Sequence, residues 1–369
     1  MDSQKHLTSI LEYIEENADI DHFNETVKRF NNVLDYVPNE SPLIKINVPC
    51  QRFPLYTMEE IHSDVNKMMA NELNSAISVL NVKDDSFITI RPNYGVGILP
   101  SLFGMNCSII DGNMPWVEHK DKDTLLKIID KGIPDLSSGY GQRVIECYEF
   151  YNEMLSKYPK AREIVRIYQP DLQGPFDVAH LMLGSEIFME MYDDEDFVHG
   201  LISLVCDTYV EFMKKITPYL TDKIGNGIFQ WREIHGGNIL LRNDTAVCIS
   251  LDMYKEYAQK YDKRLFDEFG GGAMHFCGKA DQWLTDMIHN GGCSSLNFGY
   301  IKKMGFGKEY LDKVLHEMAK EKLPLISYIF GRDEISDMRF SDYCTGVTFA
   351  MSAKDEAEGI ELLRKHRGH

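Results

Sequence analysis

The chain has 369 residues, of which 44% are hydrophobic and 26% charged, and its formal net charge is −18. This composition is typical of a globular protein and excludes a disordered tail protein, a collagen-like fibre and a small disulfide scaffold. The negative charge argues against a nucleic-acid-binding protein, because a phosphate backbone needs a basic protein surface.

The sequence also indicates where the protein works. It holds no run of 18 apolar residues, so we expect no membrane span. Residues 1–16 lack the basic head and apolar middle of a secretory signal. The eight cysteines are scattered and form no Cys-x-x-Cys pair, as in a reducing compartment. We therefore expect a soluble cytoplasmic protein that binds neither membrane nor nucleic acid.

The N-terminal region shows helical spacing of its apolar residues. Leu7, Ile10, Leu11 and Ile14 recur on one helical face, and the pattern continues to about residue 36. We predict a helical arm over residues 1–40, ahead of a main fold over residues 41–369.

Short β-rich segments then alternate with amphipathic helices. The helices are expected over residues 201–216, 252–269, 281–289, 308–320 and 354–364. The eight expected strands are 43–48, 87–91, 164–168, 238–243, 273–277, 295–298, 324–330 and 346–351. A repeated strand–helix order predicts a parallel sheet, and eight strands favour a closed (β/α)8 TIM barrel over an open sheet.

In such a barrel, functional residues lie at the carboxyl ends of the strands. The strand that ends at Cys277 carries His275 two residues earlier, and side chains of a strand alternate between its two faces. His275 and Cys277 therefore face the same way, and an imidazole with a thiolate makes half of a zinc site. The alternative is that both are ordinary buried residues without a metal.

Several residues are candidates for the third ligand. Asp244 ends the preceding strand, so we expect it on the same rim; its alternative role is a cap or an ion-pair partner. Glu233 and His235 lie in a Gly-rich segment that we expect to be a loop. Cys344 precedes the last strand, which places it at the opposite end of a barrel.

Four segments resemble the uroporphyrinogen decarboxylase superfamily, over about residues 87–365. They are His275-Phe-Cys-Gly278 followed by Gly291-Gly292, Gln173-Gly-Pro-Phe-Asp-Val-Ala179, Asp244 to Tyr254, and the loop after an early strand at 90–104. Within the superfamily, the methyltransferase branch has a His-x-Cys-Gly strand that binds zinc, and it is the most similar. The resemblance implies a TIM barrel.

Two departures separate the chain from its relatives. The Arg-Gln-Ala-Gly-Arg segment that holds substrate carboxylates in uroporphyrinogen decarboxylases is absent, and a protein of charge −18 suits an eight-carboxylate porphyrinogen poorly. The zinc methyltransferases have a third ligand cysteine after the last strand, where residues 349–352 here read Phe-Ala-Met-Ser. A carboxylate such as Asp244 is then the expected third ligand, and the alternative is that the zinc site is altered or absent.

The resemblance implies methyl transfer between a small substrate and a corrinoid (cobalamin) that a separate corrinoid protein carries, and it makes a homodimer plausible. Arg91, Asn93, Asp171 and Gln173 follow expected strands and are candidates for substrate binding; their alternative roles are loop hydrogen bonds and turns. Tyr300, Arg332 and Asp333 are further candidates. The substrate and the direction of transfer stay open. The alternative functions are a metal-free decarboxylase-like enzyme and a non-catalytic partner of a corrinoid protein.

Overall fold

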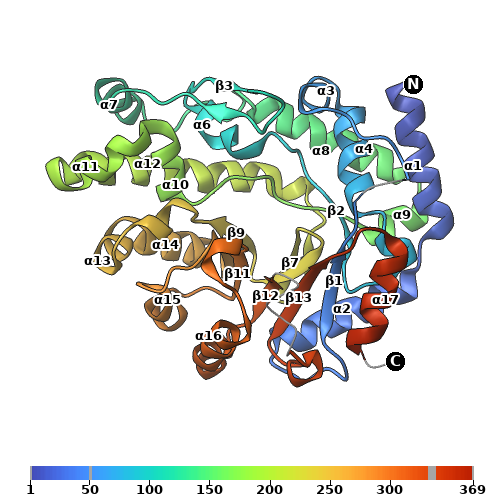
Figure 1. Cartoon of the computed structure of the whole chain (residues 1–369). Coiled ribbons are helices and arrows are strands. Elements are labelled where there is room, and N and C mark those ends of the chain that lie inside the picture. Colours follow the sequence, from blue (N-terminus) through green and yellow to red (C-terminus); the bar gives the residue numbers. More distant parts are fainter. Residues whose placement is uncertain (1, 50–51, 331–337, 368–369) are drawn as a thin grey trace.

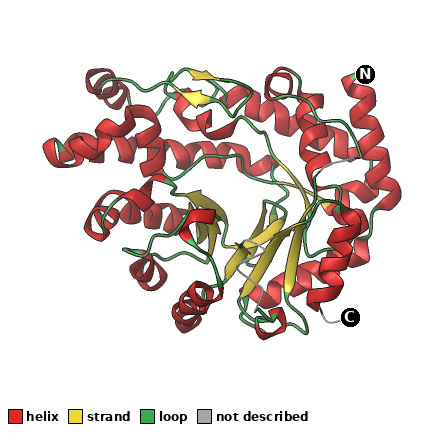
Figure 2. Ribbon diagram, viewed as in Figure 1, coloured by secondary structure: helices red, strands yellow, loops and turns green. Residues whose placement is uncertain are grey.

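The computed structural model describes residues 2–49, 52–330 and 338–367. Strands gather at the centre and helices surround them (Figure 1, Figure 2). The eight strands expected from the sequence are all present, each within one residue of the predicted bounds. They are β1 Leu43–Asn47, β2 Ile88–Ile90, β5 Val165–Ile167, β9 Ile239–Arg242, β10 Gly272–Cys277, β11 Ser295–Gly299, β12 Leu325–Ile329 and β13 Val347–Ser352.

These eight strands form two parallel sheets. Six of them pair in the order β1-β13-β12-β11-β10-β9, and β2 pairs with β5. Side chains join the edges of the two sheets. The amide of Gln169, after β5, accepts from the backbone N of Leu240 (3.0 Å) and donates to its O (2.8 Å). The carboxylate of Asp85, before β2, accepts from the backbone N of Ile44 (2.8 Å). Both sheet edges are therefore hydrogen-bonded, although no backbone ladder links them among the described residues.

Most of the expected helices are confirmed. After β9 the chain forms α13 Leu251–Tyr254, a π-helical turn Lys255–Gln259 and α14 Lys260–Phe269, where the sequence predicts one helix. Next come α15 Leu284–Asn290, α16 Lys308–Glu321 and α17 Glu356–Arg367. These helices lie outside the six-stranded sheet (Figure 1), so the side chains on its inner face point toward the centre of the molecule.

Two connections are long. The first, from β2 to β5, holds α6 Ile98–Leu102, the short antiparallel pair β3 Cys107–Ser108 and β4 Trp116–Val117, and then α7 Lys122–Lys131, α8 Gly141–Ser156 and α9 Pro159–Ile164. The second, from β5 to β9, holds α10 Pro175–Leu183, α11 Ile187–Asp193, α12 Glu195–Ile216, β6 Lys223–Ile224, β7 Gly227–Gln230 and β8 Glu233–Gly236.

The expectation of a loop around Glu233 and His235 is wrong, because both lie on β8. Strands β6, β7 and β8 form an antiparallel sheet that packs its last strand against the inner face of the six-stranded sheet. The Nζ of Lys45 on β1 pairs with the carboxylate of Glu233, and the hydroxyl of Thr348 on β13 donates to it (3.0 Å). All four residues of β8 are buried although two of them, Glu233 and His235, are polar, so the segment lacks the apolar run by which a buried strand is recognised in a sequence.

Glycine permits this close packing. A Cβ on Gly237, which has φ +90°, would lie 2.5 Å from the backbone N of Gly272 on the neighbouring strand. Only glycine fits a contact this close at a positive φ. The glycines around 236–237 therefore reflect tight packing of β8 against β10.

The predicted N-terminal helices are α1 Ser3–Asn17 and α2 Ile20–Leu34. The four apolar residues of α1 named above are fully buried, and α1 packs against α9 and α4 (Val65–Ala76). From α2, the ring of Phe23 contacts the rings of Phe87 and Phe229, with centroids 5.2 and 5.9 Å apart. Two smaller helices, α3 Met58–Ser63 and α5 Val79–Val82, complete this region. The arm is thus packed onto the main fold through a shared apolar core.

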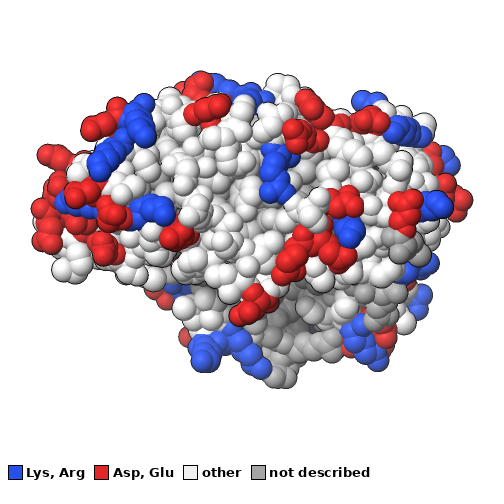
Figure 3. All heavy atoms as spheres, turned by 90° about the horizontal axis from the view of Figure 1, so that it is seen from above, with Lys and Arg blue, Asp and Glu red and all other residues white. Residues whose placement is uncertain are grey.

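Charge is distributed unevenly over the surface. On the face in Figure 3, charged side chains of both signs lie mostly around a broad uncharged area, and acidic side chains gather at its left end, where α11 lies. This end carries Glu186, Glu190 and residues 193–196, all of them acidic.

In the described part of the chain, no helix is both long enough and apolar enough to span a bilayer.

Candidate metal centre

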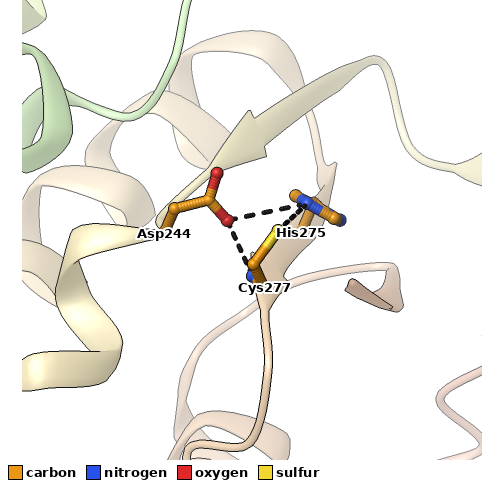
Figure 4. A group of neighbouring side chains, drawn as sticks. All are labelled: Asp244, His275 and Cys277. Atoms are coloured by element: carbon orange, nitrogen blue, oxygen red, sulfur yellow. Dashed lines mark hydrogen bonds and ion pairs between the residues drawn. The ribbon is translucent and has the colours of Figure 1, made fainter. Parts of the chain in front are cut away.

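Three side chains with metal-binding atoms converge at the carboxyl ends of β9 and β10 (Figure 4). The Sγ of Cys277 lies 3.6 Å from the Nε2 of His275, and this Nε2 lies 3.6 Å from the Oδ1 of Asp244. One possible ligand atom from each residue falls within 4.8 Å of the other two, and the described residues hold no second group of this kind. The three residues predicted as ligands from the sequence therefore come together.

The alternation of β10 places two of these ligands. Met274 and Phe276 are buried under the helices, whereas His275 and Cys277 point inward and stay partly accessible. Gly278 then ends the strand with φ +91°. On β11, a Cβ at Gly299 would lie 2.5 Å from the Sγ of Cys277, so the absence of a side chain there leaves space for the thiol.

Asp244 reaches β10 from the neighbouring strand. The backbone N of Asn243 donates to the O of His275 (2.8 Å), which is the last backbone hydrogen bond between the two strand ends. At the next position, the Oδ1 of Asp244 accepts a hydrogen bond from the backbone N of Cys277 (2.7 Å). Asp244 thus extends the β9–β10 ladder by one side-chain bond. The carboxylate acts as a cap for β10, and the same oxygen faces His275 and Cys277.

A polar relay orients the imidazole of His275. The Nδ2 of Asn297 on β11 donates to the backbone O of Ile326 (2.7 Å), which leaves its Oδ1 to face the Nδ1 of His275 at 2.5 Å. An amide oxygen only accepts, so Nδ1 carries the proton. In this tautomer Nε2 has a free lone pair, which points toward Cys277 and Asp244 and is available to a metal ion.

The environment holds both candidate ligands in their neutral forms. Burial raises the pKa of the Cys277 thiol to about 12, and the charge of Asp244 adds to this effect. Burial also lowers the pKa of His275, although Asp244 opposes the shift. His275 is therefore a neutral imidazole near pH 7, and the thiol of Cys277 keeps its proton unless a cation displaces it.

We expect Asn297→Leu to weaken metal binding. The substitution removes the acceptor for the Nδ1 proton of His275, so the ring loses its preferred tautomer and orientation. Loss of such a supporting hydrogen bond lowers metal affinity about 10- to 100-fold in other proteins. Competition with a chromogenic chelator would measure the affinity, and Asn297→Asp, which keeps an acceptor, is the matched control. Equal affinities of wild type and Asn297→Leu would contradict the relay.

The predicted substrate-binding residues only partly converge. The Nη1 of Arg91 lies 3.5 Å from the Oδ2 of Asp171, and the Nε2 of Gln173 donates to its Oδ1 (2.5 Å). Asn93 instead turns to α4, where its Nδ2 donates to the Oε1 of Glu72 (3.0 Å). The structure therefore groups Arg91, Asp171 and Gln173 and assigns Asn93 a loop hydrogen bond.

None of the other candidates joins the triad among the described residues, and two lie outside those residues. Glu233 is paired with Lys45, and His235 is fully buried on β8. The Sγ of Cys344 contacts the O of Ser341 before the amino end of β13, as the sequence predicts. Tyr300 follows β11, whereas Arg332 and Asp333 fall within the segment that the structure does not describe.

Sequence analysis missed two residues beside the triad. Arg242 ends β9 and is the register partner of His275. Trp231 lies in the turn between β7 and β8, with its ring centroid 4.9 Å from that of His275 and 4.6 Å from the Cζ of Arg242. The alternation of side chains along β9 could have predicted that Arg242 faces the interior, because residues two positions apart share a face and Leu240 faces the interior.

Comparison with known proteins supports the fold. No family model matches the chain, and no curated protein matches its sequence. A methyltransferase from Methanosarcina mazei has a similar structure, with a TM-score of 0.61 and 13% identity over 91% of this chain and 97% of that one. The two proteins therefore share a fold along almost their whole lengths.

Proposed function

We propose that the protein is a methyltransferase that moves a methyl group between a small substrate and a corrinoid carried by a partner protein. We further propose that zinc binds at Asp244, His275 and Cys277. The observation that carries the proposal is the convergence of these three side chains at the carboxyl ends of neighbouring parallel strands. The shared fold with a methyltransferase supports the reaction class.

The triad fits the geometry of zinc. Zinc bonds to nitrogen, sulfur and oxygen ligands are about 2.0–2.3 Å long, so two ligands at a tetrahedral angle lie about 3.5 Å apart. The separations from Nε2 of His275 to Sγ of Cys277 and to Oδ1 of Asp244 are both 3.6 Å. Three protein ligands leave a fourth position for substrate, which is the pattern of a catalytic site.

The protein's own groups provide the remaining requirements of the reaction. Zinc, when bound, supplies a Lewis acid that keeps a substrate thiol ionised or makes a methyl group easier to transfer. The Nδ1–H of His275 donates to the Oδ1 of Asn297, so the lone pair of Nε2 faces the other two ligands. Asp244 holds the backbone of Cys277 in place while its carboxylate remains partly exposed on the rim.

We also infer that the eight parallel strands close into a (β/α)8 barrel. The Gln169 and Asp85 side chains bridge the two places where a backbone ladder is absent among the described residues. In such a barrel the triad lies at the mouth, the face from which a corrinoid on a partner protein would approach the substrate.

Metal content tests the proposal directly. We expect about one zinc per chain, by mass spectrometry of untagged protein, and a clear loss of zinc in Cys277→Ser. Uptake should release a proton, because the ligand thiol must ionise. Cys248→Ser is the matched control, since Cys248 is exposed and lies outside the triad. Wild-type protein that takes up no zinc after reconstitution would overturn the proposal.

If zinc is present, methyl transfer is tested next with methylcobalamin and a panel of thiols. We expect the absorbance spectrum of methylcobalamin to change to that of the demethylated form with wild type and not with Cys277→Ser. Zinc binding without transfer to or from any cobalamin would contradict the corrinoid part of the proposal.

A further inference from the structure

Arg242 is a buried guanidinium with too few partners. Its side chain is 2% exposed, and it faces the interior beside His275. None of its three nitrogen atoms makes a hydrogen bond within the described structure. Its Nε lies 3.4 Å from the Oδ1 of Asp171, and the face of its guanidinium lies against the ring of Trp231.

Arg91 shares the same acceptor. Its Nη1 lies 3.5 Å from the other oxygen of Asp171 and makes no hydrogen bond to any described residue. Gln173 already donates to Asp171. The carboxylate of Glu72 is occupied by the backbone N of Arg91 (3.2 Å) and by Asn93. One carboxylate, that of Asp171, thus faces two guanidinium groups and an amide.

This cluster therefore holds more donors than acceptors. A guanidinium carries five N–H donors in a planar fork, and almost all buried polar groups in proteins are hydrogen-bonded. Burial opposes ionisation of Asp171, yet Arg242 and Arg91 together keep the pKa of its carboxyl below the ordinary value. Asp171 is consequently a carboxylate that accepts only, and the surplus donors call for another acceptor.

The position of the cluster indicates where that acceptor comes from. Arg242 and His275 are register partners on neighbouring strands, which lie about 4.8 Å apart. Arg91 and Asp171 keep side-chain exposures of 11% and 16%, so the cluster opens on their side. A molecule only a few atoms long can span from the triad to the arginines.

We propose that Arg91 and Arg242 form a binding subsite for a negatively charged oxygen group, such as a carboxylate, on a small substrate whose reacting end lies at the triad. This inference rests on the proposed function. The planar fork of arginine matches two oxygens of a carboxylate, and such charge-assisted bonds are stronger than neutral ones. Trp231, which touches both Arg242 and His275, then forms a wall between the two ends of the substrate.

Three small thiols that share a two-carbon chain and carry an anionic, a neutral or a cationic group at its other end test the subsite. We would load the protein with Co²⁺ and titrate 3-mercaptopropionate, 2-mercaptoethanol and cysteamine, following the thiolate-to-cobalt absorption band, which reports binding without turnover. Wild type should bind the anionic thiol about ten-fold or more tightly than the other two. In Arg242→Gln the three dissociation constants should converge.

Control variants keep the test decisive. Arg264→Gln, which removes an exposed arginine of α14, should retain the wild-type preference. Arg91→Gln applies the same test at a less buried position if Arg242→Gln does not fold. If wild type binds cobalt but has equal dissociation constants for the three thiols, the subsite is overturned and the proposed function stays intact. Equal constants are the expected result if only water fills the arginine cluster. Failure to bind metal would overturn both.

Discussion

Glu233→Gln is expected to destabilise the protein by about 3–5 kcal/mol, because it leaves the ammonium of Lys45 buried without a counter-charge. The two side chains are 1% and 8% exposed, and no bulk water can replace the lost carboxylate. Lys45 would keep only neutral acceptors, which are the backbone O of Trp231 at 3.3 Å and the amide oxygen that replaces one carboxylate oxygen. Urea denaturation at pH 7 would measure the free energy of unfolding.

The double variant Lys45→Met/Glu233→Gln separates a lost ion pair from a general disturbance of packing. Because it buries no unpaired charge, it should recover a large part of the stability lost in the single variant. If Glu233→Gln lowers the free energy of unfolding by less than about 1 kcal/mol, the pair contributes no more than an exposed salt bridge does. That result would contradict the packing of β8 against the inner face of the sheet.

Asp262→Asn is expected to make stability less dependent on pH. Burial raises the pKa of the Asp262 carboxyl from 3.8 to about 7, although the Nδ2 of Asn243 donates to it. The folded state then binds a proton that the unfolded state has already released, so the free energy of unfolding falls as pH rises from about 4 to about 7. One pH unit corresponds to about 1.4 kcal/mol, so this single group lowers stability by up to about 4 kcal/mol.

The amide that replaces this carboxyl in Asp262→Asn cannot ionise, so the pH-dependent loss of stability disappears. Relative to wild type, the variant should therefore become more stable as pH rises from 4 to 8, in urea titrations across that range. Asp252→Asn on α13 is the control, because its exposed carboxylate meets water in both states. A pH-independent difference between wild type and Asp262→Asn would show that Asp262 is already ionised at pH 5.

Asp262 also bears on the candidate metal centre. Its carboxyl holds the side chain of Asn243, which directly precedes Asp244. Asn243 lies so close to Gly174 that a Cβ on this glycine would overlap the Oδ1 of Asn243. The loop after β5 and the end of β9 are therefore packed together beneath the triad.

Much of the fold was predictable because its signals are local. The strand segments are short, rich in β-branched and aromatic residues and separated by amphipathic helices, and all eight occur where expected. The same alternation within β10 correctly placed His275 and Cys277 on one face. The substrate-binding residues were less predictable, since Asn93 turned to Glu72 while Arg91, Asp171 and Gln173 converged.

The interior hairpin was not predictable from the same signals. Both faces of β8 are buried although it carries Glu233 and His235, so the segment has the polar and Gly-rich character of a connection and not the apolar character of a buried strand. Its turn also gives no signal, because Trp231 and Arg232 adopt positive φ values of 47° and 72° where Asn-Gly would be usual. The surroundings hold the turn, since the backbone N of Arg232 donates to the hydroxyl of Thr89 (3.0 Å).

The succession of strands along the chain, their bounds and the placement of His275 and Cys277 on one face all follow from the sequence alone. That Asp244 completes the triad, that Asn297 orients His275 and that Arg242 lies beside them follows only from the folded structure. The reason is that alternation within a strand is set by neighbours two residues apart. Contacts between residues 22 and 33 positions apart, such as His275 with Asn297 and Cys277 with Asp244, depend on the register between strands. That register arises only when the whole sheet packs.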